Sequence, residues 1–578
     1  MKNIRATLAI VWRIATPYFK SDDKWAGGIL LASVIAIQLA LVGNSVLFNQ
    51  WRGRFYNAIQ EKNWDGFKRE MIVFIALATV LVVLQIYNVY LSQWLQIRWR
   101  NWMTRRYLGG WLHDANHYRM QLQGDAADNP DQRISDDVKM FVDQTLGVGL
   151  GLLSSIVTFF SFTVVLWGLS ADAPLHLFGS LIPGYLVWAA LIYAIFGTAL
   201  TQWIGSPLVN LNFEQQQREA DFRFNLVRVR ENSEQIALLR GDRTEREGLL
   251  GRFGRVIANW YAIMSRTKRL MAFTQSYAQA AVVFPILLMA PAYFANKILL
   301  GPVLQGAEAF GNVNDALSFF VSSYRTLAEW RAVVARLDGF EMSIETASNL
   351  KEKSDSIQYL ASDGIRAIDL KDLLVRLPNG EPLIAADAFH IQDHERLLVS
   401  APSGAGKSTL FRAIAGIWPF GSGSISIPAN ASLMMLPQRP YFPIAPLHAS
   451  IAYPSDASNF GAERMKEVLK EVGLPQLAGR LNEEQHWNRM LSLGEQQRLG
   501  IARALLQAPK FLFLDEATAS LDEPSEAALY RLLAEKLPDS TIVSIGHRAT
   551  LEAFHQRKMT LKRESDHFAL PVSIEAAK

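Results

Sequence analysis

Long apolar runs alternate with charged segments over roughly the first 330 residues of the chain. Such runs can cross a membrane, because a helix of about 20 apolar residues spans a hydrocarbon layer of about 30 Å. A large soluble helical core is the alternative interpretation, and the repeated membrane-spanning length argues against it. The predicted spans cover residues 25–48, 71–95, 146–169, 178–204, 273–300 and 309–330.

The sixth predicted span contains the polar residues Asn312, Asn314, Asp315 and Arg325, which lower its hydropathy. We include it because an even number of spans returns the chain to the side on which it entered. The first 24 residues have only a short apolar stretch and no small-residue cleavage site. They predict an amphipathic helix at the membrane surface rather than a signal peptide.

Arginine is concentrated between spans two and three and between spans four and five. Positively charged residues remain on the cytosolic side, so both termini are predicted to be cytosolic. Polar residues inside the spans are compatible with hydrogen bonds between helices or, as a set, with a polar translocation path. They include Gln38, Asn44, Gln85, Asn88, Gln93, Gln275 and Gln279.

The remaining composition narrows the possible functions. A chain of 578 residues is too long for one core and predicts two or more domains. The 58 basic and 54 acidic side chains leave a net charge of +4, which does not indicate a nucleic-acid partner. The chain has no cysteine, which excludes disulfides, thiolate metal sites and thiol catalysis.

Residues 401–409, Ala-Pro-Ser-Gly-Ala-Gly-Lys-Ser-Thr, predict a phosphate-binding loop between an apolar strand at 397–399 and a helix at 410–417. Its glycines let backbone N–H groups point at phosphates, and the helix N-terminus adds positive potential. Lys407 would reach the β- and γ-phosphates, and the Ser408 hydroxyl would bind Mg²⁺. The predicted nucleotide contacts are Ser403, Gly404, Ala405, Gly406, Lys407, Ser408 and Thr409.

One position departs from the usual pattern of such loops. Ala401 replaces the customary first glycine. Alanine tolerates positive φ poorly, so strain is expected there if the loop needs that conformation.

The apolar run 511–514 leads directly into Asp515 and Glu516. A buried strand at this place would bring Asp515 beside the loop, where it can orient Mg²⁺. Glu516 would then accept a proton from an attacking water. Two solvated acids at a strand end are the alternative, and the upstream Lys407-Ser408 pair argues against it.

Residues 491–498, Leu-Ser-Leu-Gly-Glu-Gln-Gln-Arg, precede a predicted helix at 499–506. Ser492 and Gly494 can offer a hydroxyl and a backbone N–H to a phosphate. The segment resembles the L-S-G-G-Q signature of ATP-binding cassette (ABC) proteins. Leu493 stands at the first glycine of that signature and Glu495 at its glutamine.

Further motifs agree with this resemblance. Gln438 matches the Q-loop, which senses Mg²⁺ and touches the membrane domain; Asp522 matches the D-loop, and His547 the switch histidine. The resemblance therefore implies catalytic roles for Glu516, His547 and Gln438. It implies Mg²⁺ binding by Ser408, Gln438 and Asp515, and nucleotide binding by Ser492, Gly494, Glu495 and Asp522. Leu377 stands where the family usually has an adenine-stacking aromatic residue, so stacking is expected to be weak or apolar.

The chain as a whole looks like an ABC half-transporter. It is most similar to the SbmA/BacA-like bacterial permeases and the peroxisomal acyl-CoA half-transporters of subfamily D. The resemblance rests on residues 129–134, 231–237, 410–419 and 436–441 and on Gly241. It implies a multidomain chain with a six-helix all-α transmembrane domain of type I exporter form, followed by an α/β P-loop NTPase domain. The expected division is 1–345 for the first domain, 346–360 for the linker and 361–578 for the second.

The same resemblance implies a homodimer in the cytoplasmic (inner) membrane that binds ATP and Mg²⁺ and transports a bulky solute such as a peptide, cofactor or amphipathic molecule. Residues 113–122 and 225–240 are expected to contact the ATPase domain. A fatty acid, acyl-CoA or lipid transporter is the alternative, followed by an ATP-switched membrane regulator without flux. The identity of the solute and the direction of transport stay open.

Overall fold

The computed structural model describes residues 2–578 except 123, 125–128, 175, 178–179, 351–355, 363–365, 403, 430, 565, 571–574 and 577–578. The chain forms two compact units. The first comprises Met1–Tyr107 and Asp131–Asp338, and the second comprises Leu108–Pro130 and Gly339–Lys578. The predicted division assigned the whole loop between spans two and three to the membrane domain. Part of this loop, Leu108–Pro130, belongs to the second unit.

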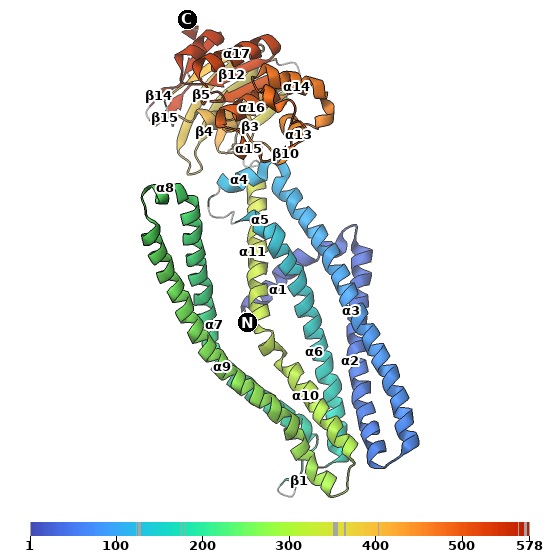
Figure 1. Cartoon of the computed structure of the whole chain (residues 1–578). Helices are drawn as coiled ribbons and strands as arrows, with labels where there is room; N and C mark the ends of the chain where they lie inside the picture. Colours follow the sequence, from blue (N-terminus) through green and yellow to red (C-terminus); the bar gives the residue numbers. More distant parts are fainter. Residues whose placement is uncertain are drawn as a thin grey trace. The chain divides into compact units, whose positions relative to one another are not determined.

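The first unit is a bundle of long helices (Figure 1). Among the described residues, five helices are long and apolar enough to cross a membrane, namely those that contain α2, α3, α6, α7 and α9. The helices are α1 (Lys2–Ala15), α2 (Lys24–Gln60), α3 (Trp64–Leu112), α5 (Pro130–Gln132), α6 (Val138–Asp172), α7 (Tyr185–Glu231), α8 (Ser233–Leu238), α9 (Asp242–Phe294), α10 (Leu300–Ser322) and α11 (Tyr324–Asn349). Helices α3 and α11 continue into the second unit.

One predicted boundary of the fourth span and one of the fifth span are corrected. The fourth span begins with α7 at Tyr185 rather than at 178, because Gly184 before it has a left-handed φ of 65°. The fifth ends with α9 at Phe294 rather than at 300, because the next turn carries Asn296 with φ 54°. Hydropathy does not detect these helix ends, since most of the residues around them are apolar.

The sixth predicted span corresponds to α10, which starts at Leu300 rather than at 309 and ends at Ser322 rather than at 330. Side chains of α2 cap its first turn. The backbone N–H of Leu300 donates to Oε1 of Gln60 at 2.6 Å, and that of Gly301 donates to Oδ1 of Asn57 at 2.9 Å. Because this cap comes from a distant helix, the helix start could not be predicted from the local sequence.

Helices α7 and α9 run side by side and are joined by the short α8 (Figure 1). The tip of this hairpin exposes two consecutive leucines. Leu238 is 77% exposed and Leu239 is 82% exposed. Two neighbouring apolar side chains that are largely exposed at a helical tip are typical of a surface that meets another protein surface.

The second unit contains two six-stranded sheets. The first has the order β16-β13-β6-β12-β11-β8, and its strands other than β16 are parallel. These strands are β16 (Glu575–Ala576), β13 (Arg557–Thr560), β6 (Arg396–Ser400), β12 (Thr541–Ile545), β11 (Phe511–Asp515) and β8 (Leu433–Leu436). The four side chains Phe511 to Leu514 have no exposed surface, as the continuous apolar run predicts for a central parallel strand.

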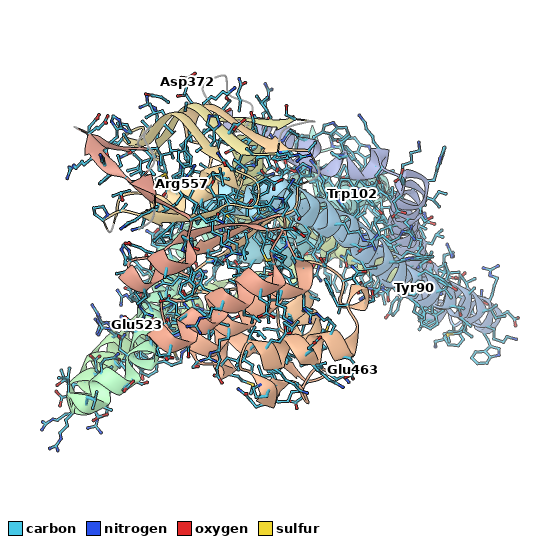
Figure 2. All side chains as sticks on the ribbon, turned by 90° about the horizontal axis from the view of Figure 1, so that it is seen from above. Tyr90, Trp102, Asp372, Glu463, Glu523 and Arg557 are labelled. Atoms are coloured by element: carbon cyan, nitrogen blue, oxygen red, sulfur yellow. The ribbon has the colours of Figure 1, made fainter. Side chains whose placement is uncertain are left out.

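The second sheet has the order β14-β15-β5-β4-β7-β3. Its strands are β14 (Lys562–Glu564), β15 (His567–Ala569), β5 (Pro382–Ile391), β4 (Ile368–Arg376), β7 (Gly421–Pro428) and β3 (Gln358–Ser362). The unit's larger helices are α12 (Lys407–Ile414), α13 (Leu447–Ala452), α14 (Ala462–Glu471), α15 (Trp487–Met490), α16 (Leu493–Gln507) and α17 (Glu523–Lys536). Figure 2 shows Asp372 of β4 and Glu463 of α14 at opposite edges of this unit.

The second unit also includes α4 (Asn116–Leu122) from the first predicted cytosolic loop. Tyr118 and Leu122 of this helix pack against the apolar core that holds the phosphate-binding loop. The predicted contact of residues 113–122 with the ATPase domain therefore has a structural counterpart within one compact unit.

Candidate functional site

The predicted site residues meet at one edge of the parallel sheet. Strands β6, β12, β11 and β8 are consecutive neighbours in the sheet and run in the same direction. Their carboxyl ends lead into the loop at 401–406, into His547, into Glu516 and into Gln438 respectively. Ligands of parallel α/β sheets bind at this edge, so segments up to about 150 residues apart in sequence converge on one place.

The loop between β6 and α12 has the conformation of a phosphate cradle. Gly404 and Gly406 have φ values of 80° and 85°, which glycine adopts without strain. Ala401 does not adopt a positive φ, so the strain predicted for this alanine is absent. Ala405 and Thr409 are buried beside the loop. Ser403, also predicted to contact nucleotide, lies outside the described residues.

Lys407 lies at the first position of α12, where it folds back over the loop. Its Nζ donates to the carbonyl of Ala401 at 2.8 Å and to that of Pro402 at 3.3 Å. Burial lowers the pKa of Lys407, while the carboxylates of Glu516 and Asp515 act in the opposite direction. The ammonium group is therefore held by neutral carbonyls that a polyphosphate can replace with stronger, charge-assisted hydrogen bonds.

Ser408 and Asp515 are brought together as predicted for a magnesium site. The Ser408 hydroxyl donates to Oδ1 of Asp515 at 2.9 Å. Burial raises the pKa of Asp515, and the hydrogen bond from Ser408 opposes that shift. Gln438 follows β8 and is exposed. Its backbone carbonyl accepts a hydrogen bond from Nε2 of Gln497 at 3.0 Å. A hydroxyl, a carboxylate and a carboxamide supply the oxygen ligands that Mg²⁺ prefers, so the donor set fits this ion.

Glu516 and His547 face each other next to Lys407. Nε2 of His547 lies 3.2 Å from Oε1 of Glu516 and 3.2 Å from Nζ of Lys407. Glu516 has a φ of 52°, which is unusual for a residue other than glycine and is typical of strained functional positions. The strand ends thus hold the imidazole of His547 within hydrogen-bond distance of both a carboxylate and an ammonium group.

Ser492 is the N-cap of α16 and forms a capping box with Glu495. The backbone N–H of Glu495 donates to the Ser492 hydroxyl at 3.3 Å, and the backbone N–H of Ser492 donates to Oε2 of Glu495 at 2.9 Å. The helix therefore starts at Leu493 rather than at the predicted 499. Gly494 lies in the first turn, with Leu521 3.2 Å from the place where a Cβ would stand.

The segments that carry Ser492 and the phosphate-binding loop pack on different apolar cores of the second unit. Leu491 and Leu499, on either side of the signature segment, belong to one core, and Ala401 and Ala405 belong to the other. The predicted signature is therefore carried by a different part of the domain than Lys407 and Ser408.

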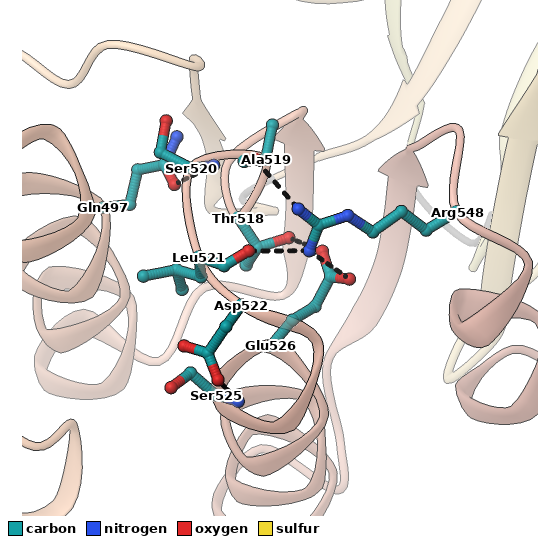
Figure 3. A network of polar contacts seen from close by, with 9 residues as sticks. All are labelled: Gln497, Thr518, Ala519, Ser520, Leu521, Asp522, Ser525, Glu526 and Arg548. Atoms are coloured by element: carbon teal, nitrogen blue, oxygen red, sulfur yellow. Dashed lines mark hydrogen bonds and ion pairs between the residues drawn. The ribbon is translucent and has the colours of Figure 1, made fainter.

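Arg548 organises the segment after Glu516 and was not identified from the sequence (Figure 3). Its guanidinium donates to the carbonyls of Leu521 at 2.7 Å and Ala519 at 3.2 Å and pairs with Glu526 at 3.2 Å. Asp522 accepts a hydrogen bond from the N–H of Ser525 at 3.3 Å, which caps α17. Hydrogen bonding from Ser525 lowers the pKa of Asp522.

Gln497 completes this network, since its Oε1 accepts from the backbone N–H of Ser520 at 3.0 Å. Gln497 thereby holds both the Gln438 segment and the 519–522 segment from a single side chain. Arg548 directly follows the predicted switch histidine His547, and this position was the available sequence signal that the arginine belongs to the site. Gln497 had a signal too, because it lies within the signature-like segment 491–498.

Leu377 lies at the turn between β4 and β5. Its N–H donates to the carbonyl of Glu381 at 2.8 Å, and its carbonyl accepts from the N–H of Gly380 at 2.9 Å. Its place in a closed hairpin turn is compatible with the predicted apolar contact to a nucleobase.

Comparison with known proteins yields two family matches: ABC transporter transmembrane region 2 over residues 14–294 and ABC transporter over residues 385–519. The inner membrane ABC transporter ATP-binding protein YddA of Escherichia coli is 32% identical over 551 residues, which cover 94% of this chain and 96% of YddA. The lysosomal cobalamin transporter ABCD4 of Homo sapiens is 26% identical over 575 residues, which cover 93% of this chain and 92% of that protein.

A solved structure of a bacterial Atm1-family ABC exporter with ATP bound superposes with a TM-score of 0.68 at 16% identity. The match covers 93% of this chain and 94% of the exporter chain. At this level of identity the comparison shows a common fold, in which a helical transmembrane region precedes an α/β nucleotide-binding domain.

Proposed function

Because the chain belongs to the ABC transporters, as a half-transporter that binds and hydrolyses ATP, we propose that two copies form a homodimer that moves a bulky solute across the cytoplasmic membrane. The observation that carries the proposal is the meeting of Lys407, Ser408 and Glu516 at one sheet edge. A chain with this site and membrane-length helices has the parts needed to couple ATP hydrolysis to movement.

Dimerisation is supported by the distribution of the site residues. Lys407 and Ser408 would bind the triphosphate of one ATP, with Mg²⁺ held by Ser408, Asp515 and Gln438. Ser492 lies on a segment that packs on a separate core, and it would complete the site of the other copy. ATP would then favour the closed dimer, and hydrolysis would release it.

The exposed tip of the α7–α9 hairpin supports the same arrangement. Leu238 and Leu239 have 77% and 82% of their surface exposed in the single chain. In the proposed dimer, α8 would dock on an ATPase domain and transmit its movement to the membrane helices. Replacing both leucines with aspartate should leave basal ATPase activity largely intact while abolishing the coupling of hydrolysis to flux.

The solute class is supported only by comparison. One relative is named as a cobalamin transporter, which favours the cofactor among the predicted bulky solutes. An acyl-CoA substrate follows from the resemblance to subfamily D and is the second candidate. The relative named as an inner membrane protein supports a cytoplasmic membrane location.

Flux in sealed vesicles tests the proposal. The full chain would be reconstituted with its ATPase sites on the outside, and both uptake and release of labelled peptide, cobalamin and acyl-CoA would be measured with ATP and Mg²⁺. ATP-dependent movement of one of them, absent in the Glu516→Gln variant, supports transport. ATPase activity without flux of any solute would favour the membrane regulator, and full activity from a monomer in lipid would exclude the dimeric mechanism.

A further inference from the structure

The first unit contains a cavity of about 800 Å³ between α2, α7, α9 and α10. Cavities of about 300–1,000 Å³ are typical of sites for small organic molecules. Its lining combines aliphatic side chains with hydroxyl, amide and charged groups, including Tyr56, Thr201, Thr274, Tyr277 and Asp315. A cavity with this mixed lining suits an amphipathic molecule better than a purely apolar one.

Helix α10 supplies the polar wall through one face. Its lining residues recur at intervals of three or four and are mostly small or polar: Leu304, Ala307, Glu308, Gly311, Asn314, Asp315 and Ser318. On the other side of the helix, Phe310 and Val313 are fully buried in the apolar core of the bundle. Asn314 and Asp315, two of the polar residues that weakened the sixth predicted span, therefore lie where the helix borders the cavity.

The charges of the lining do not balance. Arg52 pairs with Oε1 of Glu308 at 3.3 Å, and Nδ2 of Asn49 donates to Oε2 of the same carboxylate at 2.9 Å. Both oxygens of Glu308 are thus satisfied. Asp315 forms no ion pair or hydrogen bond with any described residue, and it is exposed in the cavity lining. Two carboxylates and one guanidinium leave the described lining with one uncompensated negative charge.

A fixed aromatic ring borders the cavity together with this carboxylate. The Tyr277 hydroxyl donates to the carbonyl of Tyr193 at 2.8 Å and lies 2.9 Å from Oδ1 of Asn314, next in sequence to Asp315. The rings of Tyr193 and Tyr277 stack with centroids 4.4 Å apart. An anionic group and electron-rich rings in one cavity are the combination that recognises organic cations.

We propose that this cavity binds an amphipathic organic cation, with its positive group at Asp315 and its apolar body among the aliphatic and tyrosine side chains. The inference rests on the proposed transport function and narrows its solute to a cationic class. An uncompensated charge inside a membrane bundle is costly. The charge of the ligand is therefore decisive, because a cation would compensate the Asp315 carboxylate and an anion would not.

Equilibrium binding to the purified full chain without ATP tests the inference with two probes of nearly equal shape and opposite charge. Tetraphenylphosphonium is the cation and tetraphenylborate the anion. Dialysis of each probe against the protein, corrected for empty detergent micelles, should show saturable binding of the cation only. Saturable binding of the anion with equal affinity, or of neither probe, would overturn the inference without need of any variant.

Variants then locate the charge. Asp315→Asn should weaken tetraphenylphosphonium binding by about tenfold or more, whereas Asp315→Glu should keep most of it. Asp65→Asn, which removes a carboxylate that is 90% exposed outside the cavity, is the matched control and should bind as the wild type does. Unchanged binding in Asp315→Asn would overturn the assignment.

This measurement is independent of the proposed transport. Because it uses neither ATP nor a sealed membrane, the binding result stands even if vesicle flux fails. Conversely, flux of a neutral or anionic solute, combined with no cation binding, would refute this inference and leave transport itself supported.

Discussion

The hydroxyl of Ser492 donates to Oε2 of Glu495 at 2.9 Å, so the signature serine is engaged by its own helix. The same carboxylate oxygen accepts the backbone N–H of Ser492. A γ-phosphate that is to bind the serine must compete with this carboxylate and approach a like charge. Glu495 therefore stabilises the helix start, and in contrast to the nucleotide-binding role that the family resemblance implies, we expect its charge to oppose nucleotide at this position.

Glu495→Gln should lower the apparent KM for ATP. Glutamine retains the capping geometry but removes the negative charge next to the expected γ-phosphate. An exposed charge pair contributes about 0.2–1 kcal/mol, so KM should fall by about 1.4-fold to fivefold. Steady-state ATPase assays at low salt measure it, with Glu484→Gln as an exposed control on β10 (Glu484–Gln485). A KM that does not differ from that of the control would contradict the proposed repulsion.

Glu516→Gln should stop turnover while preserving nucleotide binding. The carboxylate is the proposed proton acceptor, and loss of general-base catalysis lowers rates by about 10²–10⁴-fold. ATP should then accumulate in a closed dimer, detectable by size-exclusion chromatography in detergent. Glu523→Gln changes an exposed carboxylate at the start of α17 (Figure 2) and should retain wild-type activity. Unchanged hydrolysis in Glu516→Gln would remove Glu516 from this role.

The sequence predicted those features that depend on local pattern. The buried strand 511–515 and the loop glycines follow from continuous hydrophobicity and from motif spacing, and five spans follow from length. The start of α10 could not be predicted, because its cap comes from Asn57 and Gln60 on another helix. Arg548 was missed for a similar reason, since the carbonyls that it binds are about 27–29 residues away in sequence.

Arg548→Ala should destabilise the ATPase domain and reduce hydrolysis. Glu526 is only 2% exposed, and loss of the arginine would leave its carboxylate with Thr518 as its remaining side-chain partner in Figure 3. Removing one member of a largely buried ion pair costs about 3 kcal/mol. Thermal unfolding of the full chain measures this loss, and Arg531→Ala on the exposed face of α17 is the matched control.

A second variant separates the stranded charge from the lost loop contacts. Adding Glu526→Gln to Arg548→Ala should recover part of the stability, because the unpaired carboxylate is then neutral. Hydrolysis should stay low, since the carbonyls of Ala519 and Leu521 remain without the arginine. Equal stability of the single and double variants would show that the pair with Glu526 contributes little.

His555 should make the ATPase domain less stable in mild acid. Burial lowers the pKa of His555, whose Nδ1 lies 2.7 Å from the carbonyl of Leu551 and whose Nε2 lies 2.8 Å from the Ser544 hydroxyl. The unfolded chain therefore binds a proton at higher pH than the folded one. The stabilising contribution is present above the unfolded pKa of about 6.5 and is lost as the pH falls from there through the lowered folded pKa.

The measurement is the difference in thermal stability between the wild type and His555→Gln as a function of pH. Other groups titrate equally in both proteins, so the wild type should lose its advantage below about pH 6.5 at roughly 1.4 kcal/mol per unit of pKa difference. Parallel pH profiles for wild type and His555→Gln would refute the prediction.

Gly197→Ala should destabilise the membrane bundle, whereas Gly205→Ala on the same helix should not. A Cβ at Gly197 would stand 2.1 Å from Cζ of Tyr277, while at Gly205 the nearest atom is a methyl of Leu270 at 3.6 Å. The first substitution must displace the stacked tyrosine, at a cost of about 1–3 kcal/mol. The second adds helix propensity of up to about 1 kcal/mol without a clash. Thermal unfolding in detergent compares them directly, and equal melting temperatures would mean that Tyr277 is free to move, which would also remove the fixed ring from the cavity wall.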